Sequence, residues 1–339
     1  MNFFAYRLPD DTSIHAYKSH RLLGRANGEG FVISPFSNAE DGQFTIPADT
    51  EIDIAELDSI DIENLRDKNE CGNSPSFPER SISKEEHAAM VEKVQGMMHG
   101  GALKKAVIAK TIVKESPISL SKSFQALSVA YPHAFIFCFH TPQSGTWIGA
   151  SPERLLSQNA GMMRTMALAG TRPAGSEGEW DAKNIEEQRI VRDFILDEMR
   201  SLGIRPQCRP TETRKAGPVE HLCNEITALI LADYDIQAER LLRKLSPTPA
   251  LAGYPKDEAV AAISTTEPFE RGYYGGYCGP RFKNGNFAYF VNLRSLQQNG
   301  DRICLYSGGG ILPDSNPESE WEETERKSQT LLMIIETTP

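Results

Sequence analysis

Three charged side chains share one face of a helix near the end of the sequence. Glu320, Glu323 and Lys327 recur at the spacing that brings them to one side of a helix turning about 100° per residue. Leu331 and Ile334 continue that side as an apolar stripe, so the face is expected to point inward. Because carboxylates are rarely buried unless they are paired or bound to a metal, we expect chemistry on this face.

The segment before this helix combines a strand with a run of glycines. Residues 303–307 alternate as a pleated strand does. The glycines at 308–310 lack side chains, so their backbone N–H groups could approach a ligand closely, although they could equally end a bulged strand. Asn316 followed by Pro317 is a typical helix opening. No P-loop is expected, since the G-x-x-x-x-G-K-[ST] pattern is absent.

A second predicted helix, over residues 180–202, also turns a carboxylate inward. Its apolar residues share one face, and Glu187 lies within that face while Glu186 lies outside it. Together with Glu320 and Glu323, this gives three inward carboxylates from two helices. Hard cations such as Mg²⁺ take such oxygen ligands.

A plainer interpretation of these carboxylates remains open. They could be partly solvated helix ends, or they could form ion pairs with Arg172 and Lys327. Helical periodicity alone does not decide between a metal site and ion pairs.

Two other residues could exchange protons. Lys105 lies within a predicted strand over residues 103–113, where a buried amine can act as a base because burial lowers its pKa. An exposed lysine on an edge strand is the plainer alternative. Glu153 follows a proline at a strand end, where burial could keep its carboxyl protonated or where it could simply be solvated.

His221 is expected to be a core or rim histidine, with a functional role as the alternative. Catalysis by a Ser-His-Asp triad has no support, because no G-x-S-x-G motif is present.

The elements that must position these residues follow from periodicity and turn signals. Further strands are expected over residues 3–8, 30–33, 134–140, 146–150, 162–169 and 287–293. Further helices are expected from a capping box at Ser83 to His99 and over residues 123–131, 221–232, 238–245 and 256–264. Asn299-Gly300 predicts a hairpin turn, and residues 70–78 are the best linker candidate.

The composition excludes several classes of protein. A chain of 339 residues with 40% hydrophobic and 24% charged residues is typical of a globular protein. A net charge of -10 without a basic run argues against nucleic-acid binding. No segment approaches the length of a membrane span, and the first residues do not form a signal peptide. The six cysteines are scattered, which predicts reduced thiols and a cytoplasmic location.

The sequence contains an ordered series of motifs: Lys105-Ala-Val-Ile-Ala-Lys, Gly149-Ala-Ser-Pro-Glu153, Leu168-Ala-Gly-Thr-Arg172, Asn184-Ile-Glu-Glu187, Ser246-Pro-Thr-Pro-Ala-Leu-Ala-Gly253, Glu267-Pro-Phe-Glu-Arg271, Gly275-Gly276 and the segment 302–335. Through these motifs, from about Ala102 to Ile335, the sequence resembles the chorismate-utilising enzymes, the family of isochorismate, salicylate, anthranilate and aminodeoxychorismate synthases.

The resemblance implies an α+β fold, with large stacked, mostly antiparallel β-sheets covered by helices. Residues 77–339 would form the chorismate-binding catalytic domain, and residues 1–76 an N-terminal segment packed on the same domain. The implied protein is a monomer or weak homodimer that binds a small molecule and neither nucleic acid nor membrane.

The resemblance also implies a role for each candidate residue. Mg²⁺ would be held by Glu187 and Glu323, with Glu320 as a further ligand or in support. The substrate would be bound by Ala169, Gly170, Thr171, His221, Arg294, Tyr306, Gly308, Gly310 and Lys327. Lys105 would be the catalytic base and Glu153 the catalytic acid.

Two positions favour one reaction within the family. Amine-transferring members lack the lysine base, which is present here as Lys105. The aminodeoxychorismate enzymes use a covalent lysine where this sequence has Ala169. Both imply an isochorismate synthase, an isomerase that adds water at C2 of chorismate and removes the C4 hydroxyl, for menaquinone or siderophore synthesis. A salicylate synthase, which goes on to eliminate pyruvate, and a non-catalytic chorismate-binding protein are the alternatives.

Overall fold

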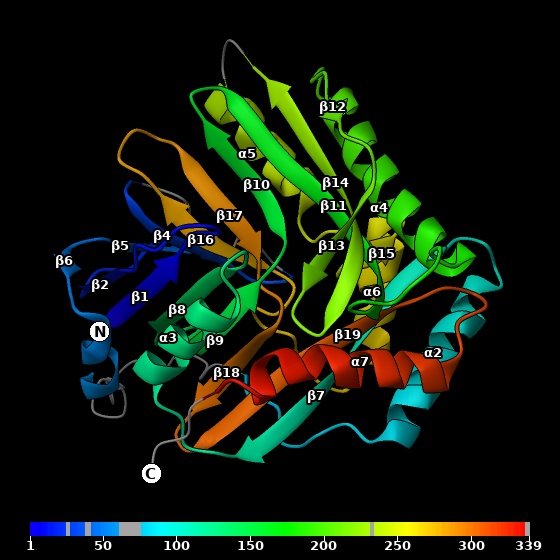
Figure 1. Ribbon diagram of the computed structural model, residues 1–339, viewed down its shortest axis with the longest axis horizontal. Helices are drawn as coiled ribbons and strands as arrows, with labels where there is room; N and C mark the ends of the chain where they lie inside the picture. The colour runs from blue at the N-terminus through cyan, green and yellow to red at the C-terminus, as the bar shows by residue number, and fades with distance from the viewer. Residues whose placement is uncertain (25–27, 38–41, 61–75, 231–233, 336–339) are drawn as a thin grey trace.

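The computed structural model describes residues 1–24, 28–37, 42–60, 76–230 and 234–335. Within these residues, two large antiparallel sheets lie face to face and helices cover their outer faces and ends (Figure 1). The expected α+β architecture of stacked antiparallel sheets is confirmed.

The first sheet contains the last strands of the chain together with the first. Its order is β15 (Gly253–Tyr254), β7 (Lys105–Glu115), β19 (Arg302–Ile311), β18 (Ser295–Asn299), β9 (Gly145–Ser151), β8 (Phe135–Thr141), β1 (Asn2–Arg7), β2 (His15–Ser19) and β6 (Thr50–Glu51). The pairing of β18 with β19 confirms the hairpin predicted at Asn299-Gly300.

The second sheet is equally mixed in sequence order. It runs β12 (Gln207–Cys208), β14 (Val219–Leu229), β11 (Met162–Pro173), β10 (Arg154–Asn159), β17 (Phe287–Val291), β16 (Tyr277–Arg281), β4 (Gly30–Ser34), β5 (Phe44–Pro47) and β3 (Leu23–Gly24). The strand β13 (Glu212–Ala216) also pairs with β14.

Aromatic side chains fill the space between the sheets. Phe135 on β8 stacks on Phe290 of β17, in the opposite sheet, with ring centroids 4.1 Å apart. Phe31 on β4 stacks in turn on Phe4 of β1, also across the two sheets, at 5.0 Å. Large rings bury much apolar area and prefer such offset contacts, so this layer holds the two sheets together.

The helices lie around the two sheets. They are the 3-10 helix η1 (Ile54–Ser59) and the α-helices α2 (Lys84–Met98), α3 (Leu120–Ala130), α4 (Ala182–Ser201), α5 (Tyr234–Leu245), α6 (Lys256–Thr266) and α7 (Pro317–Leu332). Helix α4 packs along β11, and α7 lies across β19 (Figure 1). These two helices are the ones expected to bear the inward carboxylates.

Both helix openings predicted from capping residues are confirmed. The Ser83 hydroxyl accepts the N–H of Glu86, and the Glu86 carboxylate returns a bond to the Ser83 N–H, which closes the capping box of α2. The Asn316 side chain accepts the N–H of Ser319 and begins α7, with Pro317 in its first turn.

The predicted helix over residues 221–232 was wrong, because most of this segment belongs to strand β14. Its backbone pairs with β11 on one side and with β12 and β13 on the other. A short apolar run is compatible with a helix or with a strand buried in a sheet. Here the neighbouring strands decide, since they offer ladders of backbone hydrogen bonds on both sides.

The glycines at 308–310 do not end their strand. They continue β19 and pair with residues 107–109 of β7. The predicted linker lies mostly outside the described residues. No helix among the described residues is long and apolar enough to cross a membrane.

Candidate active site

A cavity lies where the two sheets meet α4 and α7. Its walls come from β7, β11, β14 and β19, from the two helices, and from the loops after β9 and before β18. It is lined by Val107, Pro152, Glu153, Leu168, Ala169, Gly170, Thr171, Glu187, His221, Ala250, Leu251, Tyr274, Leu293, Arg294, Leu305, Tyr306, Ser307, Gly308, Lys327, Ser328 and Leu331.

Most of the residues singled out from the sequence reach this cavity. The exceptions are Lys105, Gly310, Glu320 and Glu323, which do not line it. Lys105 and Gly310 instead adjoin Glu187 at the cavity wall. Glu320 and Glu323 line a second cavity, which shares Thr171 with the first.

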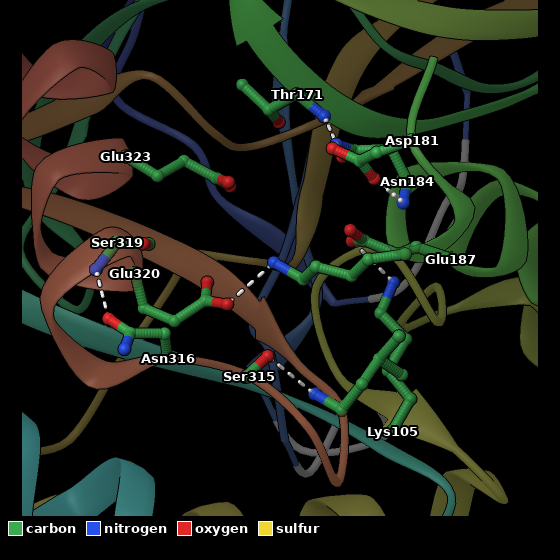
Figure 2. Close-up of polar contacts among 12 residues, drawn as sticks. Lys105, Thr171, Asp181, Asn184, Glu187, Ser315, Asn316, Ser319, Glu320 and Glu323 are labelled. Atoms are coloured by element: carbon green, nitrogen blue, oxygen red, sulfur yellow. Dashed lines mark hydrogen bonds and ion pairs between the residues drawn. The ribbon is translucent and has the colours of Figure 1, made fainter.

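Lys105 is fully buried at the start of β7. This strand lies between β15 and β19, with Lys105 opposite Tyr254, so Lys105 is not an exposed edge-strand lysine. Its ammonium nitrogen Nζ lies 2.9 Å from Oε1 of Glu187 on α4 (Figure 2). Burial alone would raise the pKa of Glu187, but Lys105 and other nearby lysines outweigh it and lower that pKa.

Glu153 follows β9 in the same interior. Only 2% of it is exposed, and burial raises the pKa of its carboxyl to about 8, against the opposing influence of the Thr248 hydroxyl and Lys105. The Thr248 hydroxyl donates to Oε1 of Glu153 at 3.4 Å. The carboxyl is therefore mostly protonated at neutral pH, which is the form that can donate a proton.

Each of the three inward glutamates has a lysine beside it. Besides the Lys105–Glu187 pair, Lys183 Nζ lies 2.6 Å from Glu320 Oε1 and Lys327 Nζ lies 2.7 Å from Glu323 Oε1. The pairing of Lys327 foreseen as the plainer alternative is thus present. The other foreseen partner, Arg172, instead binds Glu220 at 2.6 Å.

The three carboxylates point into a shared space between α4 and α7 (Figure 2). Glu320 is 1% exposed, and its Oε2 atom has no hydrogen-bond partner. Burial raises the pKa of Glu320, with the nearby Glu323 adding to the effect against the pull of Lys183. A buried acceptor without a partner is costly, so this atom is suited to a cation.

These donors fit magnesium in chemical type. In the described part of the chain, however, no three Asp, Glu, His or Cys side chains are already arranged to hold a metal ion. The lysines explain this, because Glu187, Glu320 and Glu323 each face an ammonium group rather than one common point. A metal at this place requires these ion pairs to rearrange.

On the far side of the cavity, Arg294 and His221 form a connected pair. Arg294 donates through Nη2 to Nε2 of His221 at 2.6 Å, and His221 Nδ1 donates to the Gly170 carbonyl at 2.7 Å. The histidine therefore holds its proton on Nδ1 and accepts at Nε2. Burial, and then Arg294, lower the pKa of His221 well below its ordinary value, so it is neutral.

Arg294 has a left-handed backbone, with φ of 48°. This conformation is unfavourable for a residue other than glycine and persists only where the surroundings enforce it. Its guanidinium also donates to the Ala216 carbonyl at 2.7 Å. The backbone and both hydrogen bonds fix the direction of a buried cation at the cavity wall.

A bulge in β11 shapes the wall beside His221. The register with β14 shifts between Ala169 and Arg172, and Gly170 adopts φ of 70°. The Thr171 N–H donates to Oδ1 of Asn184 at 2.7 Å, in the first turn of α4 (Figure 2). The bulge is thereby tied to the helix that presents Glu187.

The glycines of β19 allow side chains to approach the strand closely. A Cβ atom on Gly310 would lie 2.3 Å from Glu187 Oε1 and 3.1 Å from Cε of Lys105. A Cβ atom on Gly308 would lie 3.1 Å from the Tyr274 hydroxyl oxygen. The Gly308 carbonyl accepts a hydrogen bond from Lys327 at 3.0 Å. The run of glycines is thus needed for the ion pairs to pack against the strand.

Tyr306 contributes its ring to the cavity wall. It stacks between Tyr274 and Trp147, and its hydroxyl donates to Gln297 at 3.1 Å. Its hydroxyl is therefore already engaged.

Sequence reasoning missed several residues of the site. Val107, Leu251 and Tyr274 line the cavity but were not singled out, although all three lie in or beside quoted motifs. Lys183 was also missed, because a lysine in the first turn of a helix normally points to solvent and nothing in its spacing shows that it meets Glu320.

Comparison with known proteins identifies the family of this chain. The family pattern described as "Chorismate binding enzyme" matches residues 40–336. The vibriobactin-specific isochorismate synthase of Vibrio cholerae is 28% identical over 280 residues, covering 77% of this chain and 71% of that protein. Isochorismate synthase DhbC of Bacillus subtilis is 29% identical over 275 residues, covering 74% of this chain and 68% of that protein.

A solved structure shows the same fold. The menaquinone-specific isochorismate synthase MenF of Escherichia coli superposes with a TM-score of 0.78 over 98% of this chain and 88% of its own, at 22% identity.

Proposed function

Because the chain belongs to the family of chorismate-binding enzymes, we propose that it is an isochorismate synthase. Chorismate gains water at C2 and loses its C4 hydroxyl, so the reaction is an isomerisation. The relatives named above support this choice, since both are isochorismate synthases. The observation that carries it is a buried, protonated Glu153 lining the cavity, together with a buried Lys105 directly behind Glu187 in the cavity wall.

We assign the proton transfers to these two residues. Glu153 would protonate the departing C4 oxygen, because its raised pKa keeps it in the acid form. Lys105 would deprotonate the attacking water. Its position for this role is fixed by burial and by the 2.9 Å contact of its Nζ with Glu187 in the cavity wall.

The cations of the cavity suit a dicarboxylate. Arg294 and Lys327 both line it, and each is held in place by a hydrogen bond, Arg294 to His221 and Lys327 to the Gly308 carbonyl. Arg294 can bind a carboxylate with two parallel hydrogen bonds. We propose that these residues hold the substrate carboxylates, that the backbone at Gly308 and Gly310 assists, and that Ala169, Gly170, Thr171, His221 and Tyr306 enclose the ring.

We further propose that Glu187 and Glu323 hold Mg²⁺, with Glu320 as a third ligand or in support. The partnerless Oε2 atom of Glu320 supports this assignment. When bound, the cation would neutralise and orient a substrate carboxylate.

A product assay tests the activity. The purified protein is incubated with chorismate and Mg²⁺, and the products are separated by chromatography. Isochorismate is expected. An aminated product in the presence of ammonia, or no isochorismate at all, would contradict the proposal. Salicylate would instead identify a salicylate synthase, which needs the same acid and base.

Two variants test the residue roles. Lys105→Ala and Glu153→Gln are expected to lose turnover by about 10²- to 10⁴-fold while still binding chorismate, because each removes one proton-transfer group. Lys104→Ala is the matched control, since this neighbouring lysine is exposed. Loss of chorismate binding in both variants would show that the two residues are structural.

We propose that the enzyme works in the cytoplasm. The cysteines in the described residues are free thiols rather than disulfides, as is usual in a reducing compartment.

A further inference from the structure

We propose that Lys183 is a built-in counter-ion of the three-glutamate cluster, which competes with the divalent cation and must swing away before the cation can bind. This inference rests on the metal site of the proposed function. It concerns a residue that neither the motifs nor the relatives' names single out.

The geometry places Lys183 against the cluster. It lies in the first turn of α4, one turn before Glu187, and its ammonium meets Glu320 of α7 at 2.6 Å. Its ammonium is thus bonded to one proposed metal ligand, Glu320, and its helix carries a second, Glu187. Lys183 also lines the cavity that Glu320 and Glu323 line, so its charge lies where a bound cation would have to come.

The charges of the cluster balance without a metal. Three carboxylates face three ammonium groups, those of Lys105, Lys183 and Lys327. A divalent cation added to this neutral set would meet an ammonium at close range. Like charges repel strongly where water is scarce, so one ammonium must withdraw.

Lys183 is the lysine best able to leave. The Lys105 side chain is 0% exposed, and Lys327 is held by a second bond to the Gly308 carbonyl. The Lys183 side chain is 31% exposed, and it lines the cavity that also reaches Glu320 and Glu323. It can therefore turn into that cavity without crossing the core.

The position of Lys183 in the first turn of α4 makes its ammonium group less stable where it lies. The N-terminal end of a helix bears a partial positive charge, which disfavours a cation in the first turn. Asp181 is already engaged as the cap of α4, through bonds to Asn184. Among the residues that the structure describes, the ion pair of the Lys183 ammonium is with Glu320, so a divalent cation that binds Glu320 takes that stabilisation away.

Binding of Mn²⁺, a paramagnetic substitute for Mg²⁺, tests the inference without turnover. Free Mn²⁺ is followed by its electron paramagnetic resonance signal during titration of the substrate-free protein. Lys183→Met is expected to bind Mn²⁺ at least about tenfold more tightly than the wild type, because a competing charge is removed. Lys183→Arg keeps the charge and is expected to bind no more tightly than the wild type.

Thermal unfolding of the same proteins provides an independent measurement. Without metal, Lys183→Met is expected to unfold at a lower temperature than the wild type, because three carboxylates then face two ammonium groups. Saturating Mn²⁺ should raise the unfolding temperature of Lys183→Met back to that of the wild type. Lys183→Gln tests the same loss of charge with a polar side chain, should the methionine variant not fold.

The control is Lys104→Met, which removes an exposed cation from the same cavity and should leave Mn²⁺ affinity unchanged. Unchanged or weaker Mn²⁺ binding by Lys183→Met would overturn the role of Lys183 but leave the proposed metal site standing. Absence of Mn²⁺ binding in the wild type and all variants, even with chorismate present, would overturn the metal site and the inference together.

Discussion

At the scale of single residues, the site depends on ionisable side chains that are buried, where burial changes the favoured protonation state or fixes the direction of the group. Glu153 is the clearest case, because it is an acid kept protonated near neutral pH. Lys105 and His221 are likewise buried: Lys105 pairs with Glu187, and His221 is held between Arg294 and the Gly170 carbonyl. Such groups are costly in an apolar interior, so their presence together indicates selection for chemistry rather than for stability.

The raised pKa of Glu153 predicts a pH-dependent cost in stability. The pKa of Glu153 is about 8 in the folded protein and about 4.3 in the unfolded chain, so between these two pH values the folded protein holds a proton that the unfolded chain has lost. The stability that this proton contributes is complete below about pH 4.3 and is lost as pH rises through 8. Between these pH values, the free energy of unfolding of the wild type should fall by about 1.4 kcal/mol per pH unit relative to that of Glu153→Gln, which has no proton to lose. Urea unfolding at pH 5, 7 and 9 measures this difference.

The same group should limit activity at high pH. The kcat/KM of the wild type is expected to fall above about pH 8, as Glu153 loses its proton. A difference in stability that does not change with pH would contradict the buried, protonated carboxyl.

His221 is predicted to act by holding Arg294 in place. His221→Leu removes the acceptor of the guanidinium, so the KM for chorismate should rise by about ten- to hundredfold, with a smaller change in kcat. His133→Leu, at a surface histidine, is the control. Steady-state kinetics with chorismate give both constants, and an equal fall in kcat without a change in KM would show a direct catalytic role instead.

The sequence predicts the inward carboxylates and one of their partners. Helical spacing correctly turned Glu187, Glu320 and Glu323 toward the interior, since their positions follow from periodicity. Lys327, foreseen as a partner, pairs with Glu323 four residues earlier on α7. The pairings of Lys105 with Glu187 and of Lys183 with Glu320 were not foreseen, because they depend on how β7, α4 and α7 meet, which no single element encodes.

At the scale of elements, strand β19 and helix α4 fit together only because the strand lacks side chains. Gly310→Ala should displace Glu187 and Lys105, since the added Cβ would lie 2.3 Å from the Glu187 carboxylate. Activity is expected to fall at least about tenfold, because small misplacements of catalytic groups are costly. Stability should change little, because the obstructed atom is the end of a flexible side chain.

Gly96→Ala is the matched control for this substitution. Gly96 is an exposed residue of α2, and an added Cβ there would meet nothing within 4 Å. This change should leave activity unaltered and stabilise the protein by about 0.5–1 kcal/mol, as alanine is the better helix former. Chorismate turnover and thermal unfolding of both variants separate the two effects, and full activity in Gly310→Ala would refute the close-packing argument.

Helices with a periodic apolar pattern over many residues or with a capping residue could be predicted from the sequence, whereas strand β14 could not. The capping box at Ser83 and the Asn316 cap are local signals, and both helices begin as expected. Strand β14 is buried on both faces for most of its length and mixes polar with apolar residues, so its pattern does not distinguish a strand from a buried helix. Its neighbours β11 and β13 supply the missing information.

At the scale of the whole molecule, the first and last parts of the chain share both sheets. Strand β1 lies between β8 and β2, and β4 lies between β16 and β5. We propose that residues 1–76 form part of the same domain as the rest. A protein reduced to residues 77–339 would expose the edges of β8 and β16 and much of the aromatic layer, and exposed strand edges promote aggregation.

We therefore expect this shortened protein to be insoluble or to lack a cooperative unfolding transition. Expression alongside the full chain, followed by comparison of soluble yield and thermal unfolding, measures the effect. A soluble, cooperatively folding fragment that binds chorismate would show that residues 1–76 are a separate unit.

The cavity wall is drawn from both sheets, with β7 and β19 from one and β11 and β14 from the other. A ligand that fills this cavity would therefore contact both sheets, adding to the polar contact that Arg294, just before β18, already makes with His221 of β14. Amide hydrogen exchange should then slow at Thr171 and at Gly308 to similar extents on chorismate binding, although the two residues are far apart in the sequence. Substrate would act as a cross-link between the sheets as well as a reactant.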